Sequence, residues 1–254
     1  MNEILDNKMT TVIHQPYFLP WLGYFAKLVY ADKFIVLDNV YFSKRKFIDR
    51  VKIINAQGKE MWVGLPVGEN FNKPCNKIQF SDKNAINKII KSFYASYSKA
   101  RHFKNNIAQI ENILNNCFDN SNLLSEINMN IIKKIMQLLD LKMPEIILSS
   151  QFKEINDATE RVIMLCKETK CNVLISGAEG LEKHDLKKLE NNGISVSLQD
   201  YFGEHPTYFQ TRRTQLGFAK GLSVVDCIFN EGVEKTKQFI ADVKYKPIQI
   251  KEYQ

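Results

Sequence analysis

The sequence lacks the features of a membrane-spanning or disulfide-stabilised protein. Its 254 residues contain no apolar run of about 18 residues, the length that a transmembrane helix needs. The first ten residues, MNEILDNKMT, have neither the basic start nor the apolar stretch of a signal peptide, so we expect a cytoplasmic protein. The five cysteines are scattered and form no C-x-x-C pair, which argues against both a zinc site and a disulfide framework.

Several catalytic and binding signatures are also missing. The chain has no G-x-S-x-G, no Walker loop and no H-E-x-x-H, so the common hydrolase, P-loop and metalloprotease sites are not expected. It has no zinc finger, RNP motif or long basic tail, which argues against nucleic acid as a partner in spite of the net charge of +7. The cluster SKRKFIDRVK at 43–52 is consistent with phosphate binding and equally with a solvated hairpin arm.

What the sequence does contain is a regular alternation of β-rich and helical segments. The β-rich runs lie at 11–14, 33–38, 145–149, 173–176 and 194–199. This alternation predicts an α/β fold, a parallel Rossmann-like sheet flanked by helices. A β-hairpin that turns at Gly58 and a helical stretch follow the second strand. We therefore expect an α/β core of residues 1–81 and 141–254, with residues 82–140 as a helical insertion lobe.

Polar residues follow several of the predicted strands. Ligands of such sheets bind beyond the carboxyl ends of the strands, so these residues are the first candidates for substrate binding. They are His14, Gln15, Asp38, Asn39, Ser176 and Gly177. His14 suits acid–base catalysis near neutral pH, and Gln15 and Asp38 suit substrate hydroxyls. The alternatives are structural: a strand-end hydrogen bond for His14, a turn that bonds its own backbone for Asp38, and a tight turn for Gly177.

Aromatic and basic side chains form a second group of candidates. The crossover after the first strand, HQPYFLPWLGYF, carries Trp21 and Tyr24, which suit stacking on a base or sugar and equally suit a hydrophobic plug. On the basic arm, Lys44 is a candidate for a phosphate contact. The guanidinium of Arg50 suits a diphosphate because its fork binds two oxygens.

A third group lies near the C-terminal end, in EHPTYFQTRR at 204–213. We expect His205 to act as a general base on a sugar amine, with Tyr208 and Gln210 as substrate contacts. Asp226 is a candidate for orienting His205. Ser223 and Asp226 also have the spacing of a capping box, which explains both residues without a catalytic role, and His205 has the alternative of anchoring its loop.

Several stretches together resemble the WbqC-like protein family. They are IHQPYFLPWLGYF, ADKFIVLDNVYFSK, WVGLPV, ATERVIMLCK, VLISGAEG, GISVSLQDY, HPTYFQ and LSVVDCIFNEG, in the family's order over roughly residues 10 to 235. Members sit among genes for O-antigen, capsule and other surface glycans. The resemblance implies a transferase on a nucleotide-linked amino sugar, with N-acyl or N-aminoacyl transfer from a thioester of coenzyme A or an acyl carrier protein and no tightly bound cofactor.

The chain departs from the family pattern at two points. Asp49 replaces the Asn of an Asn-Arg pair, and Glu179 precedes Gly180 where the family tends to have a Gly-Gly pair. The second departure puts a rigid phosphate-binding turn in doubt.

The opening crossover also resembles the F-x-P-x-H-x-G-H loop of nucleotidylyltransferases. Trp21 and Tyr24 stand where the two histidines would be, and neither side chain can carry positive charge to a triphosphate. A nucleotidylyl- or adenylyl-transferring enzyme remains an alternative function. A non-catalytic partner of a glycan enzyme is a further alternative.

Overall fold

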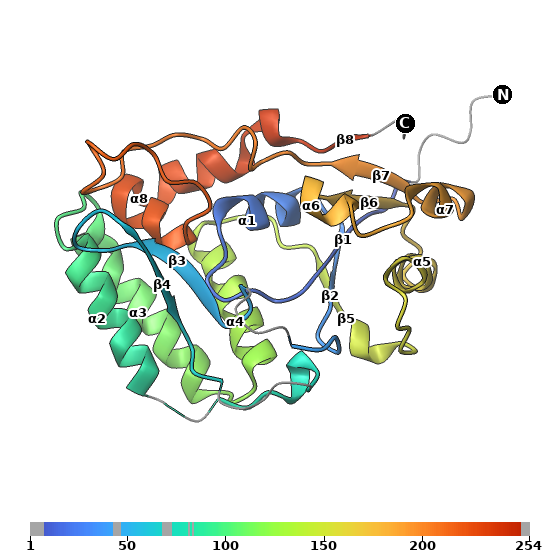
Figure 1. The fold of residues 1–254 in the computed structure, drawn as a ribbon, viewed down its shortest axis with the longest axis horizontal. Helices are drawn as coiled ribbons and strands as arrows, with labels where there is room; N and C mark the ends of the chain where they lie inside the picture. Colours follow the sequence, from blue (N-terminus) through green and yellow to red (C-terminus); the bar gives the residue numbers. More distant parts are fainter. Residues whose placement is uncertain (1–7, 43–46, 68–72, 81, 83, 250–254) are drawn as a thin grey trace.

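The computed structural model of the protein describes residues 8–42, 47–67, 73–80, 82 and 84–249. A six-stranded sheet runs in the order β5-β2-β1-β6-β7-β8 (Figure 1). Its members are β1 (Thr10–His14), β2 (Lys33–Val36), β5 (Glu145–Leu148), β6 (Val173–Ser176), β7 (Ser195–Leu198) and β8 (Ile248–Gln249). All neighbouring pairs are parallel except β7 with β8. The predicted α/β fold with a parallel sheet is confirmed.

The strand order changes direction at β1. The chain proceeds from β1 to β2 and β5 on one side of the sheet, and then from β6 to β7 on the other side. The pairing of β1 with β2 continues to His14, whereas the pairing of β1 with β6 covers only Thr10 and Thr11. The carboxyl ends of β1 and β6 are therefore not joined by ladder hydrogen bonds. Such a switch point is where doubly wound sheets bind ligands.

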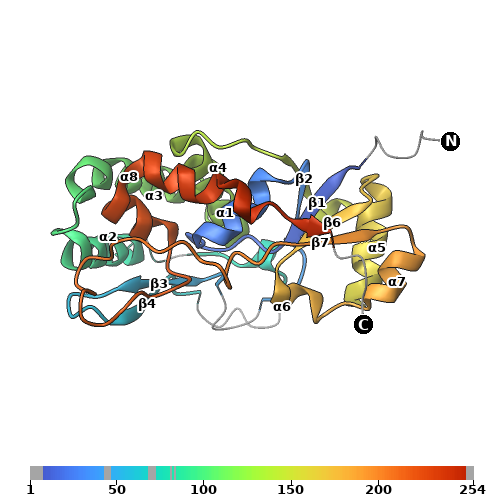
Figure 2. The ribbon, with the colours of Figure 1, turned by 90° about the horizontal axis from the view of Figure 1, so that it is seen from above.

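Helices cover both faces of the sheet (Figure 2). Helix α1 (Leu22–Val29) packs with α8 (Val224–Ala241) on one face, and α5 (Ala158–Glu168) packs with α7 (Leu186–Asn191) on the other. Side chains of β1 alternate between them: Val12 joins the first group and Ile13 the second. The short helices are α6 (Ala178–Leu181), η1 (Cys75–Lys77), η2 (Ser149–Gln151) and η3 (Val243–Tyr245).

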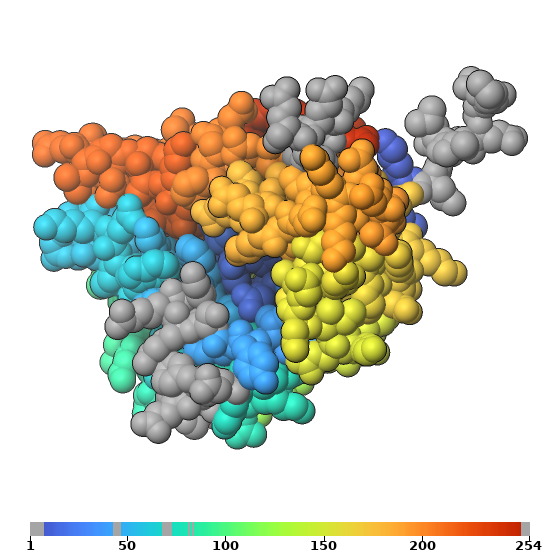
Figure 3. Space-filling view, turned by 45° about the vertical axis from the view of Figure 1, so that its right-hand side comes forward, coloured from blue at the N-terminus to red at the C-terminus, as the bar shows by residue number. Residues whose placement is uncertain are grey.

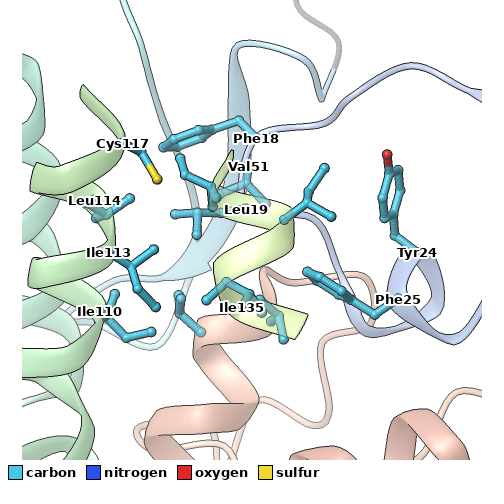
Figure 4. Close-up of a cluster of buried hydrophobic side chains, with 14 of the residues drawn as sticks. Phe18, Leu19, Tyr24, Phe25, Val51, Ile110, Ile113, Leu114, Cys117 and Ile135 are labelled. Carbon is cyan, nitrogen blue, oxygen red and sulfur yellow. The ribbon is translucent and has the colours of Figure 1, made fainter. Parts of the chain in front are cut away.

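The inserted segments are a separate two-stranded sheet and three long helices. The hairpin consists of β3 (Arg50–Ile54) and β4 (Glu60–Gly64), and the helices are α2 (Asn84–Tyr97), α3 (Phe103–Asp119) and α4 (Leu124–Leu138). Their amphipathic patterns bury apolar faces against the rest of the molecule. Ile110 of α3, Ile135 of α4 and Val51 of β3 share one continuous core with Leu19 and Phe25 of the first crossover (Figure 4). The division of the chain into a core and a lobe stays a prediction.

None of the helices in the described part of the chain combines the length and the apolar character needed to span a bilayer.

The hairpin turn is held by the arginine pair of the segment 204–213. Arg212 donates to the carbonyl oxygens of Ala56 at 2.9 Å and Ser96 at 3.2 Å, and Arg213 donates to Gly58 O at 2.7 Å. Both guanidinium groups are thus occupied by backbone acceptors. Gly58 itself has a φ of 78°, and a Cβ on it would lie 2.2 Å from Arg212 O.

We expect Gly58→Ala to lower the free energy of unfolding by about 2–4 kcal/mol, because the left-handed conformation and the collision with a backbone oxygen add up. The matched control is Gly193→Ala, where φ is 76° but nothing lies within 4 Å of the added Cβ. That variant should lose only about 1 kcal/mol in urea unfolding. Equal losses for the two variants would contradict the proposed contact.

Candidate functional site

The first crossover places a compact group of side chains at the switch point. His14 ends β1, and its ring lies edge-on between Tyr17 and Tyr24, with centroids 4.5 and 5.0 Å away. Figure 3 shows a hollow in this face of the molecule, with the blue N-terminal segment at its floor and the segments that follow β5 and β6 at its rim. The predicted ligand edge therefore coincides with a depression in the surface.

The carbonyl oxygen of Gln15 fixes the orientation of His14. It accepts hydrogen bonds from His14 Nδ1 at 2.9 Å and from the Tyr24 hydroxyl at 2.9 Å. A carbonyl oxygen only accepts, so Nδ1 carries the hydrogen and Nε2 of the neutral ring is left as an acceptor. Burial, together with the nearby charges of Lys27 and Lys183, lowers the pKa of His14 to about 3. At neutral pH His14 is thus an uncharged hydrogen-bond acceptor.

Tyr24 and Gln15 have different surroundings. Tyr24 is 1% exposed and belongs to the core, so its ring offers no face for stacking, and only its hydroxyl points out of the cluster (Figure 4). The side-chain amide of Gln15 is half-buried and makes no hydrogen bond within the part of the chain that the structure describes. Gln15 is therefore free to bind a substrate, whereas Tyr24 supports the floor from below.

Lys27 is the site residue that the sequence patterns did not reveal. It lies in the second turn of α1, is 9% exposed, and holds its Nζ 6.0 Å from the centroid of the Tyr24 ring. Burial lowers its pKa to about 8, against the opposing effect of Glu179. Its charge in turn contributes to the lowered pKa of His14. The signal in the sequence was a single lysine inside LGYFAKLV, an otherwise apolar and aromatic helix.

We expect Lys27→Met to raise the free energy of unfolding by about 3 kcal/mol at pH 7, because a pKa lowered on folding means that the folded state resists protonation. This penalty is complete below pH 8 and disappears as the pH rises toward the unfolded-state value of 10.5. Urea unfolding of both proteins at pH 7 and at higher pH measures the difference. A variant that is less stable at pH 7 would show that Lys27 supports the fold.

A strip of aromatic rings leads from the switch point to the hairpin. The ring centroids of Tyr17 and Phe47 are 5.6 Å apart, and those of Phe47 and Trp62 of β4 are 5.4 Å apart. The Arg50 guanidinium lies 4.8 Å from the Trp62 ring centroid, and its Nε is buried with no hydrogen-bond partner. Both residues line a cavity of about 420 Å³ together with Lys88. Arg50 thus retains an unused hydrogen-bond donor. Lys44, the other residue predicted to contact a phosphate, lies outside the described residues.

Asp38 lies two residues after β2 and accepts several hydrogen bonds. It is 4% exposed, and its oxygens accept from Ser150 N at 2.9 Å, Ser150 Oγ at 2.6 Å, Ser149 Oγ at 3.1 Å and Asn76 Nδ2 at 3.2 Å. Asn39 Oδ1 lies 2.6 Å from the same Ser149 Oγ, whose single hydrogen is shared between Asp38 and Asn39. This network ties the ends of β2 and β5 together, so a substrate hydroxyl would have to displace an existing partner of Asp38.

Ser176 and Gly177 form the opposite wall of the switch point. Ser176 Oγ donates to Gly177 O at 3.1 Å, and Gly177 precedes the four-residue helix α6. A Cβ on Gly180 would lie 2.4 Å from Ser176 Oγ, so this glycine is needed for close packing at the turn. A Cβ on Gly177 would meet no atom nearer than 3.9 Å, so the space above it is open.

His205 and Asp226 are not hydrogen-bond partners. His205 is 7% exposed and packs against Tyr201 and Phe218, and its Nδ1 is 2.8 Å from Pro206 O. Burial lowers the pKa of His205. The hydrogen bonds described for Asp226 come from other residues, so His205 does not receive the predicted orientation from it.

Asp226 is instead the centre of a buried network. It is 0% exposed and accepts from Tyr97 at 2.8 Å, Tyr208 at 2.8 Å and Gln210 at 3.3 Å. The Tyr97 hydroxyl in turn accepts from Ile54 N at 3.1 Å. The predicted substrate contacts Tyr208 and Gln210 are thus engaged inside the protein. Burial raises the pKa of Asp226 to about 6 in spite of these donors.

We expect Asp226→Asn to lower the free energy of unfolding, because an amide oxygen cannot serve all three donors. A raised pKa means that the wild-type carboxyl contributes most stability when protonated and loses about 3 kcal/mol as the pH rises from 4 to 6. The stability difference between the two proteins should therefore narrow over this interval. A difference that stays constant in urea unfolding between pH 4 and 6 would contradict the raised pKa.

Comparison with known proteins identifies a family and a relative of the chain. The model of the WbqC-like protein family matches residues 15–238. An uncharacterized protein of Mycobacterium tuberculosis, Rv1507c, is 25% identical over 226 residues, which cover 87% of this chain and 94% of that protein. No solved structure gives a significant match to the chain.

Proposed function

Because the chain belongs to the WbqC-like protein family, we propose that it is a transferase of surface-glycan biosynthesis that acts on a nucleotide-linked amino sugar. The group transferred is an acyl or aminoacyl group, and its donor is a thioester of coenzyme A or of an acyl carrier protein. The observation that carries the proposal is the polar opening at the switch point, where His14 and Gln15 lie at the end of β1 that is not paired with β6, and where Lys27 is close enough to lower the pKa of His14. Fold alone supports no particular activity, so the argument depends on this group of residues.

In the proposed reaction the uncharged sugar amine attacks the thioester carbonyl. A C–N bond forms, the C–S bond breaks, and the departing thiolate takes up the proton that the nitrogen loses. His14 supports this step because its Nε2 is an acceptor at neutral pH and can orient the amine through a hydrogen bond. Gln15 is proposed to hold a neighbouring hydroxyl, and Ser176 and Gly177 to line the opposite wall.

The nucleotide is proposed to lie along the aromatic strip of Tyr17, Phe47 and Trp62. These rings lead from the switch point to Arg50, whose unused Nε supports a polar contact with the part of the nucleotide that lies farthest from the sugar. The strip takes over the stacking role that the sequence suggested for Tyr24, since Trp62 is 42% exposed. Asp38 and Asn39 border the same edge of the sheet as candidates for further hydroxyl contacts.

Thermal unfolding in the presence of nucleotide-linked amino sugars, free nucleotides and coenzyme A tests binding. A ligand at about 100 times its Kd stabilises the folded state by about 2.7 kcal/mol, which should raise the Tm by roughly 5–10 °C. We expect this shift with a nucleotide sugar, and transfer is then detected as release of free thiol. If no nucleotide sugar raises the Tm, the proposal is wrong, and a shift with ATP or CTP and magnesium accompanied by pyrophosphate release would favour nucleotidyl transfer.

Two matched variants separate the histidines. His14→Leu should lower kcat about 100-fold, because the acceptor at the switch point is lost, while His205→Leu should retain turnover in the folded fraction. Circular dichroism and Tm show that each variant is folded. The reverse pattern, loss in His205→Leu alone, would support His205 as the general base that the sequence predicts. Unchanged turnover in both variants would remove both histidines from the reaction.

A further inference from the structure

Among the residues that the structure describes, no carboxylate forms an ion pair with the ammonium of Lys27, and only the charge of Glu179 opposes the lowering of its pKa. Within the described residues Lys27 forms no ion pair and no hydrogen bond, although it is 9% exposed. The lysines that do form ion pairs in the described part of the chain are all more exposed than Lys27, as Lys188 is in its pair with Glu160. Enclosing an unpaired ammonium is unfavourable, so a cation in this state is suited to an anion that arrives from outside.

The titratable groups around Lys27 come from β1, from the crossover that follows it, and from α6 with the residues after it. His14 at the end of β1 is neutral at physiological pH, and Tyr17 and Tyr24 are uncharged because burial raises the pKa of both hydroxyls. Glu179 of α6 attracts the ammonium from the rim, and its charge raises the pKa of Lys27 without an ion pair. Lys183 lies beyond α6 and adds a second positive charge, which reaches His14. The floor of the opening is therefore positive and the acidic group stands at its edge.

We propose that Lys27 binds the diphosphate of a substrate that enters through the opening between the ends of β1 and β6. The inference deepens the proposed function, on which it rests for the substrate class. A diphosphate fits because parallel sheets of this kind bind pyrophosphate at the switch point, and because its charge replaces the missing partner of the ammonium. A nucleotide sugar and coenzyme A both carry such a diphosphate, so either substrate is a source.

Proton linkage gives this contact a measurable signature. The pKa of free Lys27 is lowered to about 8, and a bound diphosphate restores the charged form. Above pH 8 the ligand therefore binds together with one proton, and its Kd rises about tenfold for each pH unit. An arginine at the same position stays protonated and abolishes this slope, and a methionine abolishes both the slope and the charge.

Isothermal titration calorimetry between pH 7 and 9 tests the contact with the full chain. The probes are UDP-N-acetylglucosamine, dTDP-glucose and dephospho-coenzyme A, diphosphate diesters whose phosphates keep a constant charge over this range. We expect at least one to bind the wild type with the tenfold slope. Lys27→Met should bind about 10- to 100-fold more weakly at pH 7 without a slope, and Lys27→Arg should retain binding without a slope. Lys183→Met, which loses an exposed rim charge, should keep the slope.

The outcomes separate the contact from the function. Equal affinity of wild type and Lys27→Met at pH 7, or an unchanged slope in Lys27→Arg, overturns the role of Lys27 even where a nucleotide sugar is a substrate. Failure of the wild type to bind any of the three probes at millimolar concentration also overturns it. Binding of dephospho-coenzyme A alone, with the slope lost in Lys27→Met, keeps the role of Lys27 and assigns the diphosphate to the thioester donor. A pH-dependent contact without any transfer to a sugar amine keeps the role of Lys27 and removes the proposed function.

Discussion

The ladder between β1 and β6 ends at Thr11, and the candidate site depends on this early end. On the other side of β1 the hydrogen bonds to β2 continue to His14, so β1 is held firmly in place. One strand is thus paired on one side and free on the other where the chain changes direction. On the free side, the end of β1 and Ser176 at the end of β6 are not joined by the ladder, so polar groups there are available to a ligand.

A second constraint is the buried carboxyl group of Asp226. The Asp226 carboxylate joins α2, α8 and the segment 204–213 through Tyr97, Tyr208 and Gln210. A buried carboxylate is tolerated there because three donors surround it, and the same donors hold an otherwise irregular segment against the helices. The candidate site and this network are therefore separate: one leaves polar groups available, and the other uses all of them internally.

The strands and the parallel sheet could be predicted because each buried strand is a short β-rich run between helical segments. The position of His14, Gln15 and Gly177 at the carboxyl ends of strands could be predicted, because each stands at the end of such a run. Sequence spacing could not reveal the partners of Asp226, because the tertiary fold decides them. One of its donors, Tyr97, lies 129 residues away in the sequence, and His205 is not among the described donors. Lys27 was missed because helical periodicity classifies a lone lysine as a solvent-facing residue, whereas tertiary packing of an eight-residue helix encloses it.

The aromatic crossover HQPYFLPWLGYF is both the floor of the opening and part of the main hydrophobic core. Phe18, Leu19 and Tyr24 are buried with helices from the inserted segment, while His14 and Tyr17 of the same crossover face the opening. A change of side chain at the floor therefore lowers the free energy of unfolding. Adaptation of this scaffold to a new sugar or a new acyl group would have to proceed at the rim, through the loops that follow β5 and β6, where substitutions leave the core intact.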